Sequence, residues 1–276
     1  MRPTVAILGA GAMGKSLARG LLKMNWRVDQ IVMADRFEDT AIEAQGLLGV
    51  TVLLDAAAAI EGRETIVVAV KPDDVSSLLE EIAGVVTADQ IVVSLVAGVP
   101  ISALELLLPD IPVVRTMPNT PASIGEAITA YCGGDHADEQ ALEKASAVLS
   151  AVGDTIQVDE DDLDAVTAVS GSGPAYVFLL AETLMEAAIR EGLSEETSER
   201  LVTQTLVGSG LLLRTVGKTA TELRSDVTSP GGTTAAALNA LERGGFDRLI
   251  MDAVRAARIR SNQLGEVAPR SAQDGG

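Results

Sequence analysis

Aromatic side chains, cysteine and histidine are scarce in this chain of 276 residues. Aromatic residues make up 2% of it, so its interior must be built from Ala, Val, Leu and Ile. The single cysteine, Cys132, excludes an intrachain disulfide and a cysteine-based metal cluster. The single histidine, His136, lies in the polar run GGDHADE and is interpreted as a solvated loop residue, so no metal site is expected.

Positive charge is also scarce. The 21 Lys and Arg residues against 39 Asp and Glu residues give a net charge of −18. Nucleic-acid binding begins with Lys and Arg on phosphates, and an anionic membrane repels an acidic chain, so neither partner is expected. An anionic ligand would need local positive potential, which helix N-termini and a few Arg or Lys residues supply.

Long apolar runs without interruption are missing as well. The N-terminal stretch MRPTVAIL enters a strand directly and lacks the apolar region of a signal peptide. The longest uncharged run, Ala165 to Ala181, is broken by Ser-Gly-Ser-Gly-Pro and is interpreted as the start of a buried helix, not a membrane span. We therefore expect a cytoplasmic protein.

The first half of the chain alternates between strand and helix patterns. Amphipathic segments at Ala12–Met24, Glu38–Leu48, Asp73–Ala83 and Ile101–Leu108 predict helices. This alternation predicts an α/β domain with a mostly parallel, doubly wound sheet covered on both faces. The predicted strands are 4–8, 30–34, 65–70, 90–96 and 112–117, with two shorter ones around Ala127–Tyr131 and Thr155–Val158.

Strand patterns stop after Asp159, and the second half is predicted to be all helical. Helices are expected from Pro174 to Gly192, from an N-cap at Ser194, and over 218–226, 233–243 and 246–264. We predict a dinucleotide-binding domain at 1–160, a helical domain at 161–265 and a disordered tail at 266–276. The apolar residues of the helical domain lie on more than one helix face, which favours a homodimer through this half over a packed monomer core. They are Leu201, Val202, Leu206, Leu211, Leu212 and Leu213.

A glycine-rich loop follows the first predicted strand in VAILGAGAMGKSLARGLL. Gly9 allows a tight turn, Gly11 lets backbone approach a pyrophosphate, and Gly14 allows close helix–strand packing. In this strand–turn–helix context the motif predicts a Rossmann domain that binds NADH or NADPH. The loop residues are Gly9, Ala10, Gly11, Ala12, Met13 and Gly14.

Asp35 and Arg36 stand side by side about twenty residues after this motif. An Asp there accepts a hydrogen bond from the ribose 2′-OH of NAD, whereas an Arg suits the 2′-phosphate of NADP. The sequence leaves the choice between NAD and NADP open.

Three further segments end predicted strands at the edge where such sheets bind ligands. Their candidate residues are Ala69, Val70, Lys71 and Pro72 in AVKP, Ala97 and Gly98 in SLVAGV, and Met117 and Asn119 in RTMPNTP.

Two of these residues carry specific interpretations. Asn119 offers both a donor and an acceptor for a carboxamide. Lys71 is interpreted either as a phosphate or ribose contact or as a solvated lysine before Pro72.

The stretch VTSPGGTTAAALNALE at 227–242 joins a Pro-Gly-Gly turn to a helix. One interpretation is a turn with a threonine cap. The other is a helix start whose free N–H groups bind a carboxylate while one threonine offers its hydroxyl to the ligand.

Together these motifs resemble the pyrroline-5-carboxylate reductase family over about residues 4–265. The similarity rests on GAGAMG, AVKP, RTMPNTP, VSGSGPAY (169–176) and above all DVTSPGGTTAAALNALERGGF (226–246). It implies reduction of 1-pyrroline-5-carboxylate to L-proline by a nicotinamide cofactor, the last step of proline biosynthesis. The implied fold is a Rossmann domain followed by an all-α dimerisation domain, with the substrate site in the dimer interface and dimers often assembled into rings.

The resemblance also implies roles for single residues. The loop equivalent to 227–234 holds the substrate carboxylate through backbone amides, and the Thr234 hydroxyl contacts the ring nitrogen. A cyclic imine is readily protonated, so little side-chain acid catalysis is needed, and either Thr234 or a water is expected to relay the proton. The implied substrate-binding residues are Ser172, Val227, Ser229, Gly231, Gly232, Thr233 and Thr234.

The sequence departs from the family pattern in two places. Arg224-Ser225-Asp226 replaces the usual basic–acidic pair before the turn, and Asp55 or Ala56 replaces an Asn at the adenine-side ribose. β-Hydroxyacid dehydrogenases share the layout but need a lysine that this chain lacks between Lys144 and Lys218. A non-catalytic NAD(P) sensor would need only the glycine-rich loop.

Overall fold

The structure, a computed structural model, describes residues 2–267 and contains two compact units. The first unit comprises the chain up to Ser172 and the stretch from Ala257 onward. The second unit is the segment Gly173–Ala256 between them. The second unit is therefore an insertion into the first along the chain.

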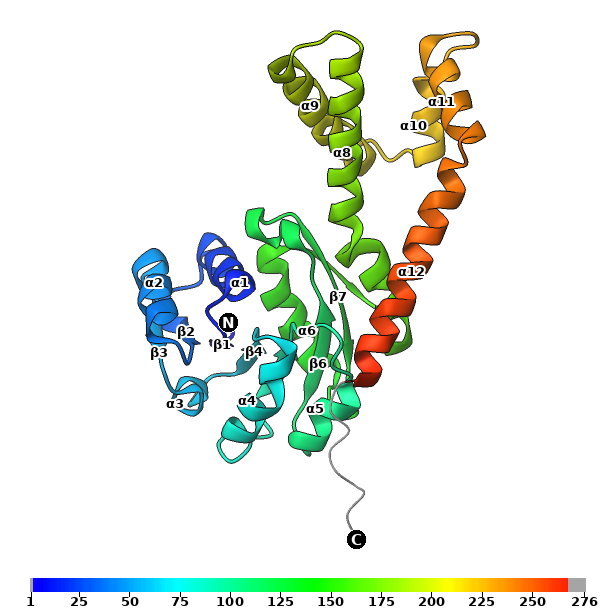
Figure 1. Cartoon of the computed structure of the whole chain (residues 1–276). Coiled ribbons are helices and arrows are strands. Elements are labelled where there is room, and N and C mark those ends of the chain that lie inside the picture. The colour runs from blue at the N-terminus through cyan, green and yellow to red at the C-terminus, as the bar shows by residue number, and fades with distance from the viewer. Residues whose placement is uncertain (1, 268–276) are drawn as a thin grey trace. The chain divides into compact units, whose positions relative to one another are not determined.

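The first unit is built on an eight-stranded sheet with the order β3-β2-β1-β4-β5-β6-β7-β8 (Figure 1). The part β3-β2-β1-β4-β5-β6 has the doubly wound order of a Rossmann fold. All neighbouring strands are parallel except β6 and β7. The strands are β1 (Val5–Leu8), β2 (Ile31–Ala34), β3 (Thr51–Leu53), β4 (Thr65–Val68), β5 (Ile91–Ser94), β6 (Val113–Met117), β7 (Ala127–Gly133) and β8 (Gly153–Gln157).

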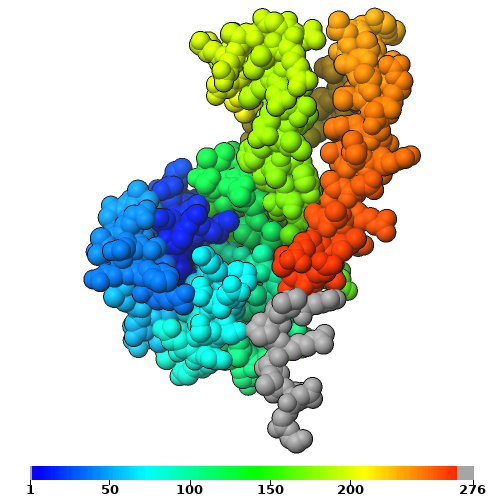
Figure 2. All heavy atoms as spheres, in the orientation of Figure 1, coloured from blue at the N-terminus to red at the C-terminus, as the bar shows by residue number. Residues whose placement is uncertain are grey.

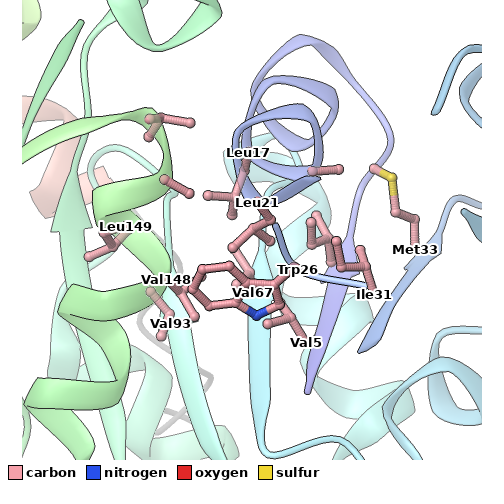
Figure 3. Packing of buried hydrophobic residues seen from close by; sticks show 14 of the residues in the cluster. Val5, Leu17, Leu21, Trp26, Ile31, Met33, Val67, Val93, Val148 and Leu149 are labelled. Carbon is pink, nitrogen blue, oxygen red and sulfur yellow. The ribbon is translucent and has the colours of Figure 1, made fainter. Parts of the chain in front are cut away.

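Helices cover both faces of this sheet because its central strands are apolar on both sides. One core cluster joins Leu17 and Leu21 of α1 to Val148 of α6 and encloses Trp26 (Figure 3). The Trp26 indole N–H donates to the Pro3 carbonyl at 3.0 Å, so its polar group is satisfied. A second cluster, including Leu79 and Leu104, packs against the opposite face. The helices are α1 (Ala12–Lys23), α2 (Glu38–Leu48), α3 (Ala56–Ile60), α4 (Val75–Ile82), α5 (Ile101–Leu107) and α6 (Glu139–Leu149).

The predicted α/β class is confirmed, and each of the seven predicted strands corresponds to an observed one. The sequence reasoning missed β3, α3 and α6. The strand Thr51–Leu53 has three residues and the helix Ala56–Ile60 has five, too few for a periodic pattern to emerge. Helix Glu139–Leu149 has a clear apolar face and was simply not assigned.

The second unit consists of helices, as predicted. Ser194 accepts a hydrogen bond from the Thr197 N–H at 3.2 Å, which confirms it as the N-cap of α9. Thr219 and Glu222 form a capping box at the start of α10. The helices are α8 (Gly173–Arg190), α9 (Glu195–Thr215), α10 (Ala220–Asp226), α11 (Thr233–Arg243) and α12 (Phe246–Val267), and α12 runs on into the first unit.

Apolar side chains remain exposed on the helices of the second unit, drawn yellow-green to orange in Figure 2. Helix α8 has no buried residue, and Phe178 is 62% exposed. The expected buried helix start at 165–181 is therefore wrong for residues 173–181 of the single chain, although Ala168 before them is buried. The alternative of a packed monomer core also fails, because Leu201 and Leu211 are exposed and only Val202 of the six predicted apolar residues is buried.

Among the described residues 2–267, one helical run, Glu160–Arg190, is long and apolar enough to cross a membrane, and a single such run is weak evidence for a span. Thr167–Gly171 within it forms a π-helical turn. At the other end of the chain, α12 reaches Val267, two residues into the predicted disordered tail. Residues 268–276 of that tail lie outside the described part of the chain.

Candidate functional site: a dinucleotide-type sheet edge and a separate Pro-Gly-Gly turn

The glycine-rich loop, AVKP and SLVAGV each follow a strand, and backbone hydrogen bonds between neighbouring strand ends show where these segments leave the sheet. The Gly9 N–H donates to Ala34 at 2.8 Å, and the Ala69 N–H donates to Leu8 at 2.8 Å. The Leu95 N–H donates to Val68 at 2.9 Å. The glycine-rich loop, AVKP and SLVAGV therefore leave the sheet at the same edge, as their positions after predicted strands required.

The three glycines of the loop have distinct structural roles. Gly9 has a φ of 111°, and a Cβ there would collide with the Ala69 carbonyl. A Cβ on Gly14 would collide with the Gly9 carbonyl and crowd Ile7, which confirms the predicted helix–strand packing. Gly11 is the N-cap of α1, makes no side-chain cap, and faces open space where a Cβ would stand. The N-terminus of α1 is thus accessible to an anion.

Asp35 and Arg36 follow β2 and point to different partners. The Asp35 carboxylate accepts from the Ala10 N–H at 2.8 Å and from the Phe37 N–H at 3.0 Å. The Arg36 guanidinium forms an ion pair with Asp74 at 2.8 Å and stacks on Phe37 with 4.9 Å between its carbon and the ring centre. Asp35 therefore lies beside the glycine-rich loop, whereas Arg36 is held by Asp74 and Phe37.

The segments AVKP and SLVAGV present small or exposed residues at this edge. Lys71 and Pro72 are exposed at the start of the 3-10 turn η2 (Pro72–Asp74), and Ala97 is exposed after β5. Gly98 has a φ of 78°, which favours glycine, and its α-carbon faces Leu264 of α12. The approach of α12 to Gly98 has no signal in the sequence.

Asn119 connects three backbone segments instead of standing free. Its Oδ1 accepts from the Ile128 N–H at 3.1 Å, and its Nδ2 donates to the Ser170 carbonyl at 3.3 Å. One amide hydrogen and one lone pair remain for a ligand. Ser170 belongs to the π-helical turn Thr167–Gly171, where a Cβ on Gly171 would collide with the side chain of Met117. Such turns recur at functional sites, and the sequence reasoning missed this one, for which the run Ser-Gly-Ser-Gly was the available signal.

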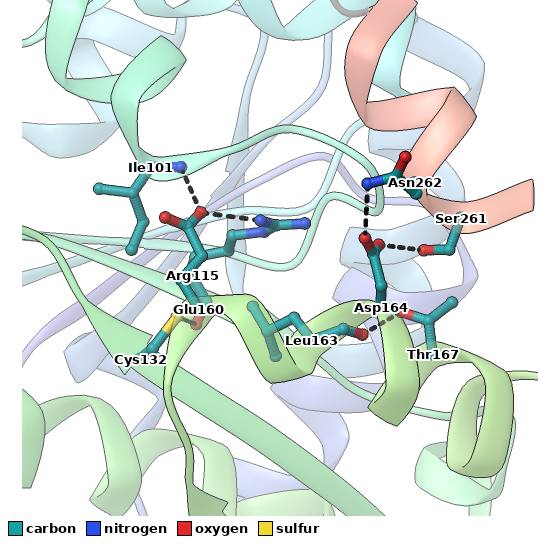
Figure 4. Close-up of polar contacts among 9 residues, drawn as sticks. All are labelled: Ile101, Arg115, Cys132, Glu160, Leu163, Asp164, Thr167, Ser261 and Asn262. Carbon is teal, nitrogen blue, oxygen red and sulfur yellow. Dashed lines mark hydrogen bonds and ion pairs between the residues drawn. The ribbon is translucent and has the colours of Figure 1, made fainter. Parts of the chain in front are cut away.

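A polar cluster fixes the chain just before this turn (Figure 4). Glu160 accepts from the Ile101 N–H at 2.8 Å and from the Arg115 guanidinium at 2.7 Å. Asp164 accepts from Ser261 of α12 at 2.6 Å and from the Asn262 amide at 3.4 Å. The start of the π-helical turn is thereby tied both to the sheet and to the last part of α12.

Cys132 lies buried on β7 beside this cluster, with its Sγ 3.8 Å from the Arg115 carbonyl. Burial raises the pKa of the Cys132 thiol to about 11, and the negative charge of Glu160 acts in the same direction. The thiol is protonated near neutral pH and is no nucleophile there.

His136 is 49% exposed in a loop, as predicted. Among residues 2–267 no group of three or more His, Cys, Asp or Glu is placed to hold a metal ion.

The Pro-Gly-Gly turn lies in the second unit and has the pattern of a type II turn. The Gly232 N–H donates to the Ser229 carbonyl at 3.0 Å, and Gly231, with a φ of 71°, occupies the position that requires glycine. Gly232 is the N-cap of α11 and gives no side-chain cap, so the predicted threonine cap is wrong. Thr233 is exposed and Thr234 half-buried in the first turn of the helix, whose leading N–H groups have no acceptor within the helix.

The structure gathers the predicted cofactor residues in the first unit, and the predicted substrate residues fall mostly in the second. Ser172 ends the first unit, directly after the π-helical turn. Asp74, which forms an ion pair with Arg36, was not foreseen, because its proximity depends on the packing of η2 beside the end of β2. The substrate residues of the second unit are Val227, Ser229, Gly231, Gly232, Thr233 and Thr234.

Family models and relatives match nearly the whole chain. Residues 160–264 match the pyrroline-5-carboxylate reductase dimerisation model, and residues 4–98 match the model of F420-dependent NADP oxidoreductases. The pyrroline-5-carboxylate reductase of Mycobacterium tuberculosis is 43% identical, covering 94% of this chain and 96% of that protein.

Solved structures of pyrroline-5-carboxylate reductases are also similar to this chain. The Coxiella burnetii pyrroline-5-carboxylate reductase is similar with a TM-score of 0.92 and 33% identity, covering 96% of this chain and 99% of that one. The Plasmodium falciparum pyrroline carboxylate reductase, solved with NADP bound, has a TM-score of 0.82 and 30% identity, with 95% and 98% coverage. Because relatives above 30% identity match over almost their full length, this chain belongs to the pyrroline-5-carboxylate reductase family.

Proposed function

We propose that this protein is a pyrroline-5-carboxylate reductase that converts 1-pyrroline-5-carboxylate to L-proline with NADH or NADPH in the cytoplasm, the last step of proline biosynthesis. The observation that carries the proposal is the 43% identity over 94% of the chain with a reductase of that name. The reaction adds a hydride to the imine carbon and a proton to the ring nitrogen, and the nicotinamide that supplies the hydride is oxidised.

Residues 1–160 are proposed as the dinucleotide-binding domain. The free N–H groups at the start of α1 bind the pyrophosphate, and Gly11 leaves room for it. Ala97 and Gly98 let the nicotinamide ring approach the backbone, and the remaining hydrogen and lone pair of Asn119 bind its carboxamide. The residues 69–72 line the site, with Lys71 contacting a phosphate or the ribose.

Residues 161–265 are proposed as the substrate and dimerisation domain. The type II turn directs the leading N–H groups of α11 to the substrate carboxylate, for which the helix N-terminus provides positive potential. The Thr234 hydroxyl positions the ring nitrogen, and either it or a water relays the proton. Positioning accounts for most of the rate in this scheme, which fits a chain with one histidine and a protonated cysteine.

The exposed apolar helices of the second unit support self-association. Phe178, Leu179 and Leu249 are each more than 60% exposed in the single chain, and the matched family model describes dimerisation. Burying such side chains against a second copy contributes roughly 1.5–3 kcal/mol for each one fully covered.

Steady-state turnover of 1-pyrroline-5-carboxylate, followed as NAD(P)H oxidation, tests the activity. Cofactor binding without turnover would favour a NAD(P) sensor and reject the proposal. Thr234→Ala is expected to lower kcat by about 10²-fold or more, the range for a lost positioning or proton-relaying group. The exposed neighbour provides the control: Thr233 is proposed to contribute only its backbone N–H, so Thr233→Ala is expected to retain most activity. Unchanged turnover in Thr234→Ala would remove that hydroxyl from the mechanism.

A further inference from the structure

The cation best placed to meet a 2′-phosphate is already paired with a carboxylate. Arg36 follows Asp35 at the end of β2, where NADP-binding folds place an arginine for that phosphate. Its Nη2 lies 2.8 Å from Oδ1 of Asp74, and its guanidinium rests on the Phe37 ring. A 2′-phosphate therefore has to compete with Asp74 for this guanidinium.

Asp35 adds a second carboxylate at the same place. It points to the glycine-rich loop, where its oxygens accept from the Ala10 and Phe37 N–H groups. Each oxygen keeps a further lone pair that suits a ribose hydroxyl and opposes a phosphate. Asp35 therefore adds a carboxylate that disfavours a phosphate, while Asp74 engages the one guanidinium that would attract it.

We propose that Asp74 is a specificity-determining residue. By holding Arg36, it lowers the affinity of the site for the 2′-phosphate of NADPH relative to the 2′-hydroxyl of NADH. The inference rests on the proposed nucleotide placement. Because the side chains of Arg36 and Asp74 are 60% and 29% exposed, the pair is weak enough for a phosphate to displace. We expect its removal to change affinity about three-fold, as for a typical exposed ion pair.

Nearby charged groups do not perform the same function. Asp55 caps α3, accepting from the Ala58 N–H at 3.0 Å, so its carboxylate serves a helix start. Lys71 is exposed at the beginning of η2, and Asp73 is exposed next to Asp74. Of these four residues, Asp74 is the one whose carboxylate lies within hydrogen-bond distance of the Arg36 guanidinium.

Calorimetric titration with 5′-AMP and with 2′,5′-ADP (adenosine 2′,5′-bisphosphate) tests the proposal, because these two nucleotides differ only at the 2′ position. Asp74→Asn is expected to tighten 2′,5′-ADP binding about three-fold and to leave 5′-AMP binding unchanged. Arg36→Ala is expected to weaken 2′,5′-ADP binding specifically. In the Arg36→Ala background, Asp74→Asn should bring no gain. The ratio of kcat/KM for NADPH and NADH is expected to follow the binding ratio.

Asp29→Asn is the matched control. Asp29 also pairs with an arginine, Arg27, at 2.8 Å, but it lies before β2 at the opposite end of that strand. The change in charge is the same, so the nucleotide ratio should stay at the value of the parent protein.

Three results would overturn the role of Asp74 while 5′-AMP still binds. They are an equal gain for both nucleotides, a gain that persists without Arg36, and a gain that Asp29→Asn reproduces. If neither nucleotide binds the parent protein, the nucleotide site itself is wrong and the inference falls with it. The two failures are therefore distinguishable.

Discussion

The two compact units differ in where their apolar side chains lie. In the first unit, Leu79 and Leu104 of the covering helices are fully buried against the sheet. In the second unit, α8 has no buried residue, and Phe178 is exposed. Apolar burial contributes about 25 cal/mol per Å², so the first unit is stabilised by its own fold, whereas the second needs a covering surface. The same residue types indicate a core in one region and an interface in the other.

The largest effect is expected from a cavity in the first unit. Leu104→Ala removes a side chain that is 0% exposed and should destabilise the protein by about 2–5 kcal/mol. Urea unfolding at several protein concentrations measures this. The loss should be the same at each concentration, because Leu104 acts within one chain. The exposed Leu106→Ala on the same helix is the control and should change the free energy of unfolding by less than about 1 kcal/mol.

A charge on the second unit should act through association instead. Phe178→Asp places a carboxylate among exposed apolar side chains and is expected to weaken dimerisation by about 10²-fold, since covering an unpaired charge costs several kcal/mol. Sedimentation velocity over a dilution series measures the dimer fraction. Glu182→Gln on the same exposed helix is the control. An unchanged dimer in Phe178→Asp would show that α8 is not at the interface.

The smallest effect concerns Cys132, whose reactivity measures how well the first unit excludes solvent from this buried thiol. Its pKa is raised by burial from 9.0 to about 11, so folding favours the protonated thiol. The resulting stability is complete below pH 9 and is lost as the pH rises through about 11. At pH 8, iodoacetamide should modify the native protein much more slowly than the urea-unfolded protein. Equal rates, measured by mass spectrometry, would contradict the burial of this side chain.

The sequence predicted the parts of the fold that repeat a simple pattern. Runs of Val and Ile identified seven strands, and the glycine spacing located the loop from Gly9 to Gly14. The short elements Thr51–Leu53 and Ala56–Ile60 were missed because they are shorter than the period that would reveal them. The strand Thr51–Leu53 is defined by its parallel pairing with β2, which is a tertiary contact.

The sequence predicted which residues belong to the candidate site, but it did not predict their hydrogen-bond and ion-pair partners. The sequence names Asn119 and Arg36, yet their contacts with Ser170 and Asp74 join positions far apart in the chain. It also led to a threonine cap for α11 where the structure has Gly232, since propensity favours Thr and the type II turn decides otherwise. Such contacts depend on tertiary packing, which no local pattern encodes.

The insertion of the second unit has a consequence for the order of synthesis. The ribosome completes the sheet before Gly173, yet the last part of the first unit begins only at Ala257. Ser261 and Asn262 therefore reach Asp164 only after every helix of the second unit has been made. Domains generally fold as units during translation. The sheet is therefore expected to fold before Asp164 can bond to Ser261 and Asn262. A chain truncated before Ala257 would lack that closing contact, however well its glycine-rich loop had formed.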